Sequence, residues 1–218
     1  VGCLGGLFTL SSCTAPTNVK DYSAYVNPFI GTGGHGHTFP GAVVPHGMIQ
    51  PSPDTRIDGW DACSGYYYAD STINGFSHTH VSGTGCCDYG DVLLMPTVGK
   101  QQYRTTDPQS QRLAYASSFS HKNEIAEPGY YSVFLDTYQV KAEISSTKRG
   151  AIHRYTFPEN TESGFIIDLD YSLQRQTNSE MEIEVISDTE ICGHKKTTYW
   201  AFDQYINFYA KFSKPFSY

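Results

Sequence analysis

The feature that most constrains the fold is a side-chain alternation with a period of two residues. In the segment YQVKAEIS, Val140, Ala142 and Ile144 fall on one side of an extended strand and polar residues on the other. Residues 204–213 (QYINFYAKFS) alternate in the same way. No stretch keeps the 3.6-residue apolar period of an amphipathic helix over three turns. Roughly ten to twelve strands, with turn signals between them, predict an all-β fold, an antiparallel two-sheet β-sandwich.

Composition argues against two classes of partner. Only 17% of the 218 residues are charged, the formal net charge is −7, and no run of basic residues occurs. Nucleic acids and anionic membrane surfaces are both recognised by clustered Lys and Arg. We therefore expect no nucleic-acid partner and no polybasic membrane contact.

Residues 1–20 have the pattern of a processing segment followed by a tether. VGCLGGLFTL is apolar and uncharged, and LSSC follows, ending at Cys13. An apolar run of about ten residues before small residues is typical of a truncated signal peptide and too short to span a bilayer. LSSC resembles a bacterial lipobox, which predicts lipidation of Cys13. We expect an exported protein, periplasmic or at the bacterial cell surface, that meets the membrane only through this lipid anchor. The alternative is a buried N-terminal strand.

The four cysteines beyond this segment carry no recognisable motif. Cys63, Cys86, Cys87 and Cys192 form no CxxC pair and have no zinc-like spacing. Export would permit disulfides, but the sequence assigns none. Cys86 and Cys87 are adjacent and are not expected to bond to each other.

Glycine-rich loops are concentrated in the first hundred residues. Three of them stand out: GTGGHGHTFPG (31–41), GWDACSG (59–65) and GFSHTHVSGTG (75–85). Long structured loops on a β-scaffold usually carry function. We therefore expect the site in this half of the chain and a regular scaffold beyond about Tyr115.

Two groups in these loops suit a polar ligand. Trp60 beside Asp61 is typical of sugar binding, because a sugar ring stacks on indole while a carboxylate accepts from hydroxyls. The alternative is a tryptophan that plugs one end of the sandwich. His78 and His80, two residues apart in FSHTH, would share one strand face and hydrogen-bond neighbouring hydroxyls.

A metal site is the less favoured interpretation of the histidines. His35 and His37 in the HGH motif add two further imidazoles. A catalytic or structural metal needs a third ligand, and no HxxxH pattern is present. Catalytic carboxylates cannot be chosen either. Asp168 and Asp170 would share a strand face, but a structural role is the better explanation for them.

The loop motifs also resemble a known family. YVNPFIGTGGHGHTFPGAVVPHGMIQPSPDT and GWDACSGYYYADSTINGFSHTHVSGTGCCDYGDVLLMPT are similar to the N-terminal domain of glycoside hydrolase family 92, bacterial exo-acting α-mannosidases. HRYTFP, FIIDLD and WAFDQYINFYAKFSKPF fit the same domain. The resemblance covers about residues 25–216. It departs from the expected pattern at His46, where Phe is expected, and at Cys87, where Gly is expected.

The resemblance implies a domain organisation. Residues 21–218 would form a β-sandwich of the galactose-mutarotase-like supersandwich type. In the family it is followed by an (α/α)6-barrel domain, which this sequence lacks. Hydrolysis by enzymes of the family inverts the anomeric centre of the sugar and depends on Ca²⁺. The catalytic acid, the base and the calcium ligands lie in the barrel, so no catalytic residue and no metal ligand is expected in this chain.

The resemblance also implies what this domain supplies. Its partners would be a mannose-containing glycan, such as an N-glycan, and its own catalytic domain, with the sugar held between them. Glycines let backbone approach a sugar, and small polar groups offer it hydrogen bonds. The residues expected to bind substrate are Gly33, Gly34, Trp60, Asp61, Cys63, His78 and His80. The alternative is a non-catalytic carbohydrate-binding sandwich.

Overall fold

The computed structural model describes residues 20–101, 103, 110–159 and 161–218. Within these residues the chain is almost entirely strand and loop, with three short 3₁₀ helices, η1 (Ser23–Tyr25), η2 (Trp60–Ala62) and η3 (Leu173–Arg175). The predicted all-β class is confirmed. The strands are β1 (Ser52–Asp54), β2 (Thr72–Ile73), β3 (Gly75–Ser77), β4 (Leu93–Val98), β5 (Ser117–Glu127), β6 (Tyr130–Leu135), β7 (Val140–Ser146), β8 (Ala151–Thr156), β9 (Ser163–Asp168), β10 (Thr177–Val185), β11 (Glu190–Thr198) and β12 (Gln204–Lys211).

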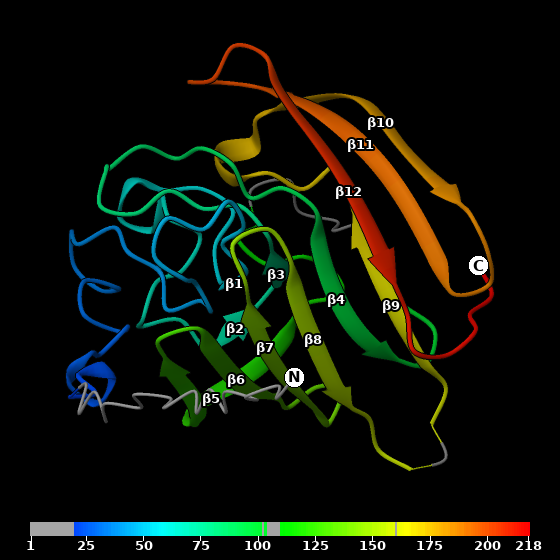
Figure 1. The fold of residues 1–218 in the computed structure, drawn as a ribbon, viewed down its shortest axis with the longest axis horizontal. Helices are drawn as coiled ribbons and strands as arrows, with labels where there is room; N and C mark the ends of the chain where they lie inside the picture. The colour runs from blue at the N-terminus through cyan, green and yellow to red at the C-terminus, as the bar shows by residue number, and fades with distance from the viewer. Residues whose placement is uncertain (1–19, 102, 104–109, 160) are drawn as a thin grey trace, which may run out of the picture.

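The described strands pair antiparallel in three hydrogen-bonded sheets. Their orders are β2-β5-β6-β7-β8, β1-β3-β4-β9 and β10-β11-β12. In Figure 1, β5–β8 lie at the lower left and β10–β12 at the upper right, with β4 and β9 between them in this view. The first two sheets pack face to face as a sandwich, and the third is an addition to the predicted two-sheet arrangement.

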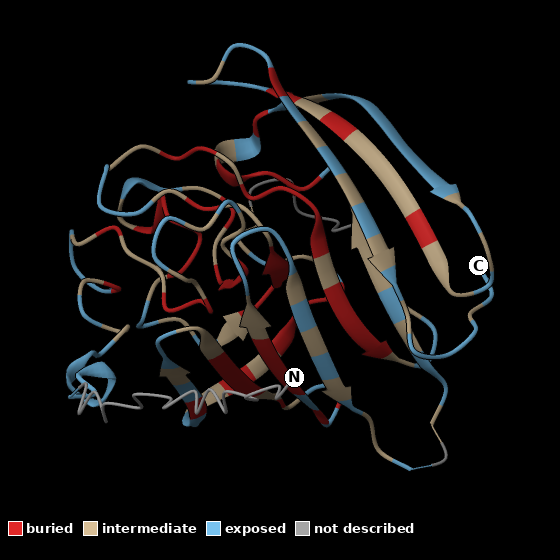
Figure 2. Cartoon of the chain, in the orientation of Figure 1, coloured by how far each residue is buried: buried red, intermediate tan, exposed pale blue. Residues whose placement is uncertain are grey.

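The core of the sandwich follows from the alternation. Val140, Ala142 and Ile144 on β7 are all fully buried, as the period of two predicts. Phe76 of β3 meets Tyr131 of β6, with ring centroids 6.4 Å apart, so the two sheets interlock through aromatic rings. Figure 2 shows the buried residues gathered between these layers, while one side of β8 and of β12 stays exposed.

The chain leaves β9 at Asp168 and reaches the third sheet at Thr177, after η3. Asp168 Oδ1 accepts hydrogen bonds from the backbone N–H groups of Asp170 (2.9 Å) and Tyr171 (3.0 Å), which turns the chain out of β9. The carboxyl groups at 168 and 170 therefore do not share a strand face, because β9 stops at Asp168. The Phe165 and Phe212 rings, 5.6 Å apart, join β9 to the segment after β12.

The loop-rich half precedes β4, as the glycine pattern predicts. Between residues 20 and 92 the strands are only two or three residues long, and most of the chain is structured loop. The segment with Cys13, predicted to be a signal and lipid attachment site, lies outside the described residues. Among the residues described, no helix is long and apolar enough to cross a membrane.

Candidate functional site

Three loop segments meet at one place in the loop-rich half, and we call them together the loop site. They are Gly31–His37, Trp60–Asp61 and Gly83–Gly85. The backbone N–H of Gly83 donates to the His37 carbonyl oxygen at 2.6 Å, which joins the first segment to the third. The His37 ring packs edge-on against the Trp60 indole, with centroids 4.4 Å apart, which joins the first to the second.

The Trp60 indole is in contact with neighbouring loop residues but remains largely exposed to solvent. Trp60 is 58% exposed, so it does not plug the sandwich, and that alternative is wrong. Gly85 lies against it at a positive φ of 65°, and a Cβ there would come 3.3 Å from Trp60 Nε1 and 3.2 Å from the His37 ring. Both the backbone conformation and the close neighbours favour glycine at this position.

Asp61 and His35 form the polar rim beside the indole. Asp61 Oδ1 lies 2.5 Å from His35 Nδ1, and both side chains reach solvent. Gly33 and Gly34, at the tip of the same glycine loop, are exposed as well. The loop site thus presents an apolar ring, a carboxylate, an imidazole and open backbone on one accessible surface, which suits a hydroxyl-rich ligand.

His80 and Cys63 are buried and do not reach the surface of the loop site. The His80 side chain is 0% exposed, with Nε2 2.9 Å from Asp54 Oδ1 and Nδ1 2.7 Å from the Gln50 carbonyl oxygen. The Cys63 side chain is buried as well. Both were expected to touch a ligand. Because both side chains are enclosed by protein atoms, they act on neighbouring protein groups and not on a ligand at the surface.

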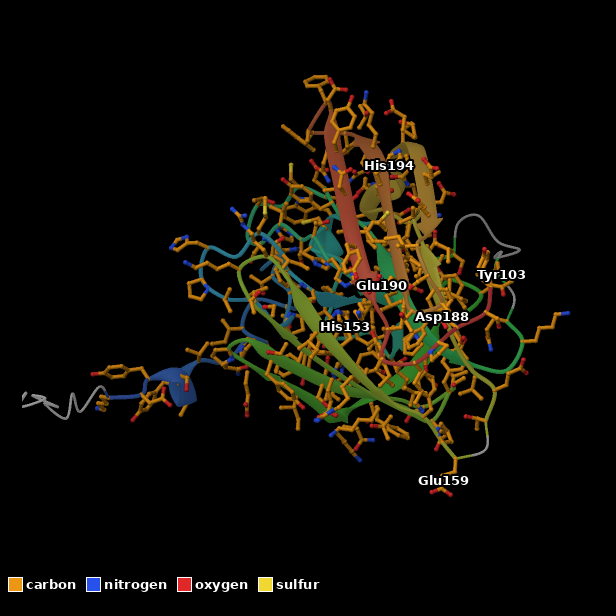
Figure 3. All side chains as sticks on the ribbon, turned by 45° about the vertical axis from the view of Figure 1, so that its right-hand side comes forward. Tyr103, His153, Glu159, Asp188, Glu190 and His194 are labelled. Carbon is orange, nitrogen blue, oxygen red and sulfur yellow. The ribbon has the colours of Figure 1, made fainter. Side chains whose placement is uncertain are left out.

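His78 points elsewhere. The expectation that it shares a strand face with His80 is wrong, because β3 ends at Ser77 and the two rings have different partners. His78 Nδ1 lies 2.6 Å from the Val92 carbonyl oxygen, and its Nε2 lies 3.1 Å from Nε2 of His153 on β8, labelled in Figure 3. His153 Nδ1 lies 2.8 Å from the Tyr155 hydroxyl.

These contacts determine where the protons sit. The Val92 carbonyl can only accept, so Nδ1 of a neutral His78 carries the hydrogen and its Nε2 accepts from His153 Nε2–H. His153 Nδ1 then accepts from the Tyr155 hydroxyl. Burial lowers the pKa of His78 and of His153, and His78 further lowers the pKa of His153.

Acid is therefore expected to destabilise the fold through this pair. Unfolded histidines take up protons near pH 6.5, whereas the pair's pKa values are lower in the folded state, so stability is full above about pH 6.5 and falls below it. His80 and Asp54, the other titratable groups that act on His78, are not altered by a substitution at His153. We expect the free energy of unfolding of His153→Phe to change less between about pH 8 and pH 5 than that of the unsubstituted protein, measured by urea titration. His46→Asn, at an exposed loop position, is the control and should keep the full dependence; an undiminished dependence in His153→Phe would contradict the assignment.

Sequence reasoning missed some of these partners. His153 gave no signal, because it stands alone in an alternating strand and meets His78 only through the fold. His35 and His37 were considered for a metal, yet they contact Asp61 and Trp60. Among the described residues no group of three or more His, Cys, Asp or Glu side chains is placed to hold a metal ion.

The fold and its loops define a β-sandwich domain that carries an open polar and aromatic site at its loop-rich end. Residues 25–218 match the glycosyl hydrolase family 92 N-terminal domain, and the chain belongs to that family. The predicted resemblance is confirmed.

Solved structures and a curated relative agree with this assignment. The family GH92 α-mannosidase BT3965 of Bacteroides thetaiotaomicron, solved with mannoimidazole, is 41% identical with a TM-score of 0.81, over 88% of this chain and 25% of that one. The family GH92 inverting mannosidase BT2199 of the same organism is 30% identical with a TM-score of 0.64, over 80% and 23%. A secreted glycosidase of Arthroderma benhamiae is 32% identical over 64% of this chain and 18% of its own length. The chain thus spans about a quarter or less of each of these relatives.

Proposed function

We propose that this chain is the N-terminal domain of a calcium-dependent, inverting exo-α-mannosidase, and that its loop site forms one half of the sugar pocket. The observation that carries the proposal is the half-exposed Trp60 beside the Asp61–His35 pair. An indole face takes the apolar side of a pyranose, and a carboxylate oxygen accepts from adjacent hydroxyls. Gly33 and Gly34 leave room for a sugar to approach the backbone.

The substrate class comes from the relatives. One similar structure is an α-mannosidase in complex with mannoimidazole, and another is described as an inverting mannosidase. We therefore infer that the substrate is an α-mannoside of a glycan, such as an N-glycan. Inversion needs two carboxyl groups far enough apart to admit a water molecule. This chain offers no such facing pair at the loop site, so we assign the acid and base to a following (α/α)6-barrel domain.

Calcium is assigned to that same domain. Ca²⁺ takes six to eight oxygen ligands, whereas the loop site carries a single carboxylate, Asp61, whose Oδ1 pairs with His35. We therefore derive no step through calcium from the residues of this chain. Its contribution is to bind and orient the sugar.

Export is the third element of the proposal. A similar glycosidase is described as secreted, which supports an exported protein. Anchoring through a lipid on Cys13, and a location in the periplasm or at the cell surface, follow from the lipobox-like LSSC. Mass spectrometry of the mature protein from its native cell would reveal an acylated N-terminal cysteine; an unmodified VGCLGG segment would contradict the anchor.

The activity is tested on the full-length protein and on residues 21–218 alone. We expect the full-length protein to hydrolyse an α-mannoside, to release the β-anomer first by NMR, and to lose activity in a calcium chelator. Residues 21–218 alone should show no turnover, because they lack a facing carboxylate pair. Turnover by the isolated domain would contradict the division of roles, and a full-length protein that binds mannosides without cleaving them would favour a carbohydrate-binding sandwich.

A further inference from the structure

A second exposed aromatic side chain, Tyr68, lies beside the glycine loop of the loop site. Its backbone N–H donates to the Thr32 carbonyl oxygen at 2.9 Å, and a Cβ on Gly33 would come 3.8 Å from Tyr68 Cβ. Gly33 and His35 are two residues apart, so their Cα atoms are at most about 7 Å from each other. The His35 ring contacts the Trp60 indole, with centroids 5.0 Å apart. The glycine loop therefore contacts Tyr68 on one side of its tip and Trp60 on the other.

The Tyr68 ring is supported by two other rings and still reaches solvent. It stacks on the imidazole of His121 on β5, with centroids 4.2 Å apart and ring planes 11° apart. The Phe29 ring lies 5.8 Å away in an edge-to-face arrangement. Tyr68 nevertheless remains 44% exposed. A ligand can therefore reach those parts of the ring that His121 and Phe29 do not cover.

A buried carboxylate fixes the imidazole that supports Tyr68. His121 Nδ1 lies 2.6 Å from Glu124 Oε2, and the Glu124 side chain is 0% exposed. Glu124 also accepts hydrogen bonds from the hydroxyls of Tyr66 at 3.1 Å and Tyr131 at 2.6 Å. The register of β5 against β6 shifts in the residues that precede Glu124, and such a bulge redirects side chains. An aromatic ring supported in this way needs little ordering when a ligand binds.

We propose that Tyr68 binds a second sugar ring, that of the leaving group attached to the mannose at Trp60. The inference rests on the proposed function, in which the loop site holds the terminal unit of a glycan. A tyrosine ring takes the apolar face of a pyranose, and its hydroxyl both donates to and accepts from sugar hydroxyls. Between the two aromatic side chains the loop tip is open, since a Cβ on Gly34 would meet no atom within 4 Å.

The test compares substrates with and without a second sugar in the full-length protein. In α-mannosyl fluoride the leaving group is a fluoride ion, whereas in an α-mannobiose it is a second mannose. We expect Tyr68→Ala to lower kcat/KM roughly threefold to tenfold on the α-mannobiose that the unsubstituted protein cleaves fastest. On α-mannosyl fluoride kcat/KM should stay unchanged, because that substrate has no ring to stack on Tyr68. The ratio of the two values does not depend on how much of each preparation is folded.

Two further variants control for the position and for the ring. Tyr199 is 45% exposed in the turn between β11 and β12, outside the loop site, and Tyr199→Ala should change neither value. Tyr68→Phe keeps the ring and should retain most of the activity on the mannobiose; a loss as large as in Tyr68→Ala would overturn the stacking role.

The outcomes separate this inference from the proposed function. If Tyr68→Ala loses equally on both substrates, or on neither, the second-sugar role is overturned while the proposed function stands. If the unsubstituted full-length protein turns over neither substrate, both are overturned.

Discussion

Replacing Lys195 with methionine is expected to lower the free energy of unfolding by about 3–5 kcal/mol. Lys195 on β11 and Asp91 before β4 form an ion pair of 3.1 Å, and both side chains are 0% exposed. Burial lowers the pKa of Lys195, and the ion pair with Asp91 opposes that shift. Lys195 Nζ also donates to the Tyr171 carbonyl oxygen at 2.8 Å. Methionine keeps the apolar stem and removes the charge, so Asp91 would remain buried without its counterion.

A neighbouring lysine provides the control. Lys196 pairs with Asp203 at 2.8 Å on the exposed side of the same strand, and Lys196→Met should cost much less stability. Denaturant unfolding followed by circular dichroism gives both values. The double variant Lys195→Met with Asp91→Asn should lose less stability than the two single variants lose together, because no charge is left buried alone. A loss below about 1 kcal/mol in Lys195→Met would contradict the assignment.

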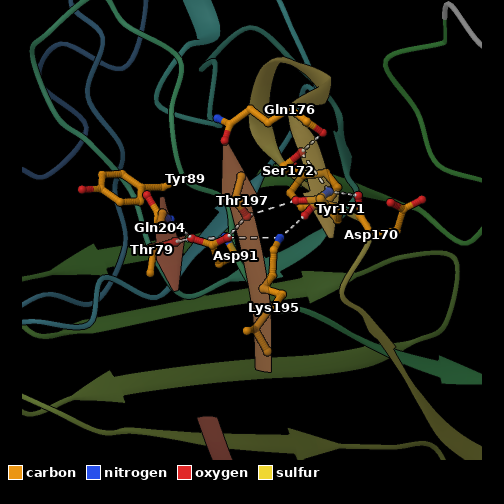
Figure 4. Close-up of polar contacts among 12 residues, drawn as sticks. Thr79, Tyr89, Asp91, Asp170, Tyr171, Ser172, Gln176, Lys195, Thr197 and Gln204 are labelled. Atoms are coloured by element: carbon orange, nitrogen blue, oxygen red, sulfur yellow. Dashed lines mark hydrogen bonds and ion pairs between the residues drawn. The ribbon is translucent and has the colours of Figure 1, made fainter. Parts of the chain in front are cut away.

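The expected size of the effect reflects what the pair holds together. Asp91 Oδ2 accepts from Thr79 Oγ1 at 2.7 Å and from Gln204 Nε2 at 2.6 Å, as Figure 4 shows. Thr79 stands between His78 and His80, and Gln204 begins β12. The network therefore ties the third sheet to the segment that carries His78 and His80.

The extent to which the fold was predictable depends on how local its determinants are. The burial of Val140, Ala142 and Ile144 follows from a period of two, because strand geometry alone sends alternate side chains to the same face. The third sheet was not predictable, because it depends on a turn set by Asp168 and on the Lys195–Asp91 pair. The turn at Asp168 has no distinctive sequence motif, and the Lys195–Asp91 pair joins residues that are distant in sequence.

The same division applies to the loop site. Trp60 and Asp61 could be selected because adjacent residues in a loop reach the surface together. His78 and His80 could not be separated by spacing. Whether β3 extends past Ser77 decides which way each ring points, and that depends on partners such as His153 and Asp54.

Substituting Trp60 with alanine in the full-length enzyme is expected to lower kcat/KM by about tenfold to a hundredfold. That corresponds to roughly 1.4–2.8 kcal/mol of lost transition-state stabilisation. The physical reason is that the exposed indole face, beside the carboxylate of Asp61, is the main apolar surface the loop site offers to a pyranose. Steady-state kinetics on an α-mannoside give the ratio, and the expectation rests on the proposed function.

Stability distinguishes this role from a structural one. Because Trp60 is already half-exposed, Trp60→Ala should change Tm little. The control is Trp200→Ala, the sequence's other tryptophan, which is 67% exposed in the turn between β11 and β12 and outside the loop site. We expect that variant to keep the kcat/KM of the unsubstituted enzyme. If Trp60→Ala instead unfolds at a clearly lower temperature while the folded fraction turns over substrate normally, then the indole only supports the loops. The sugar would in that case have to be held by other groups.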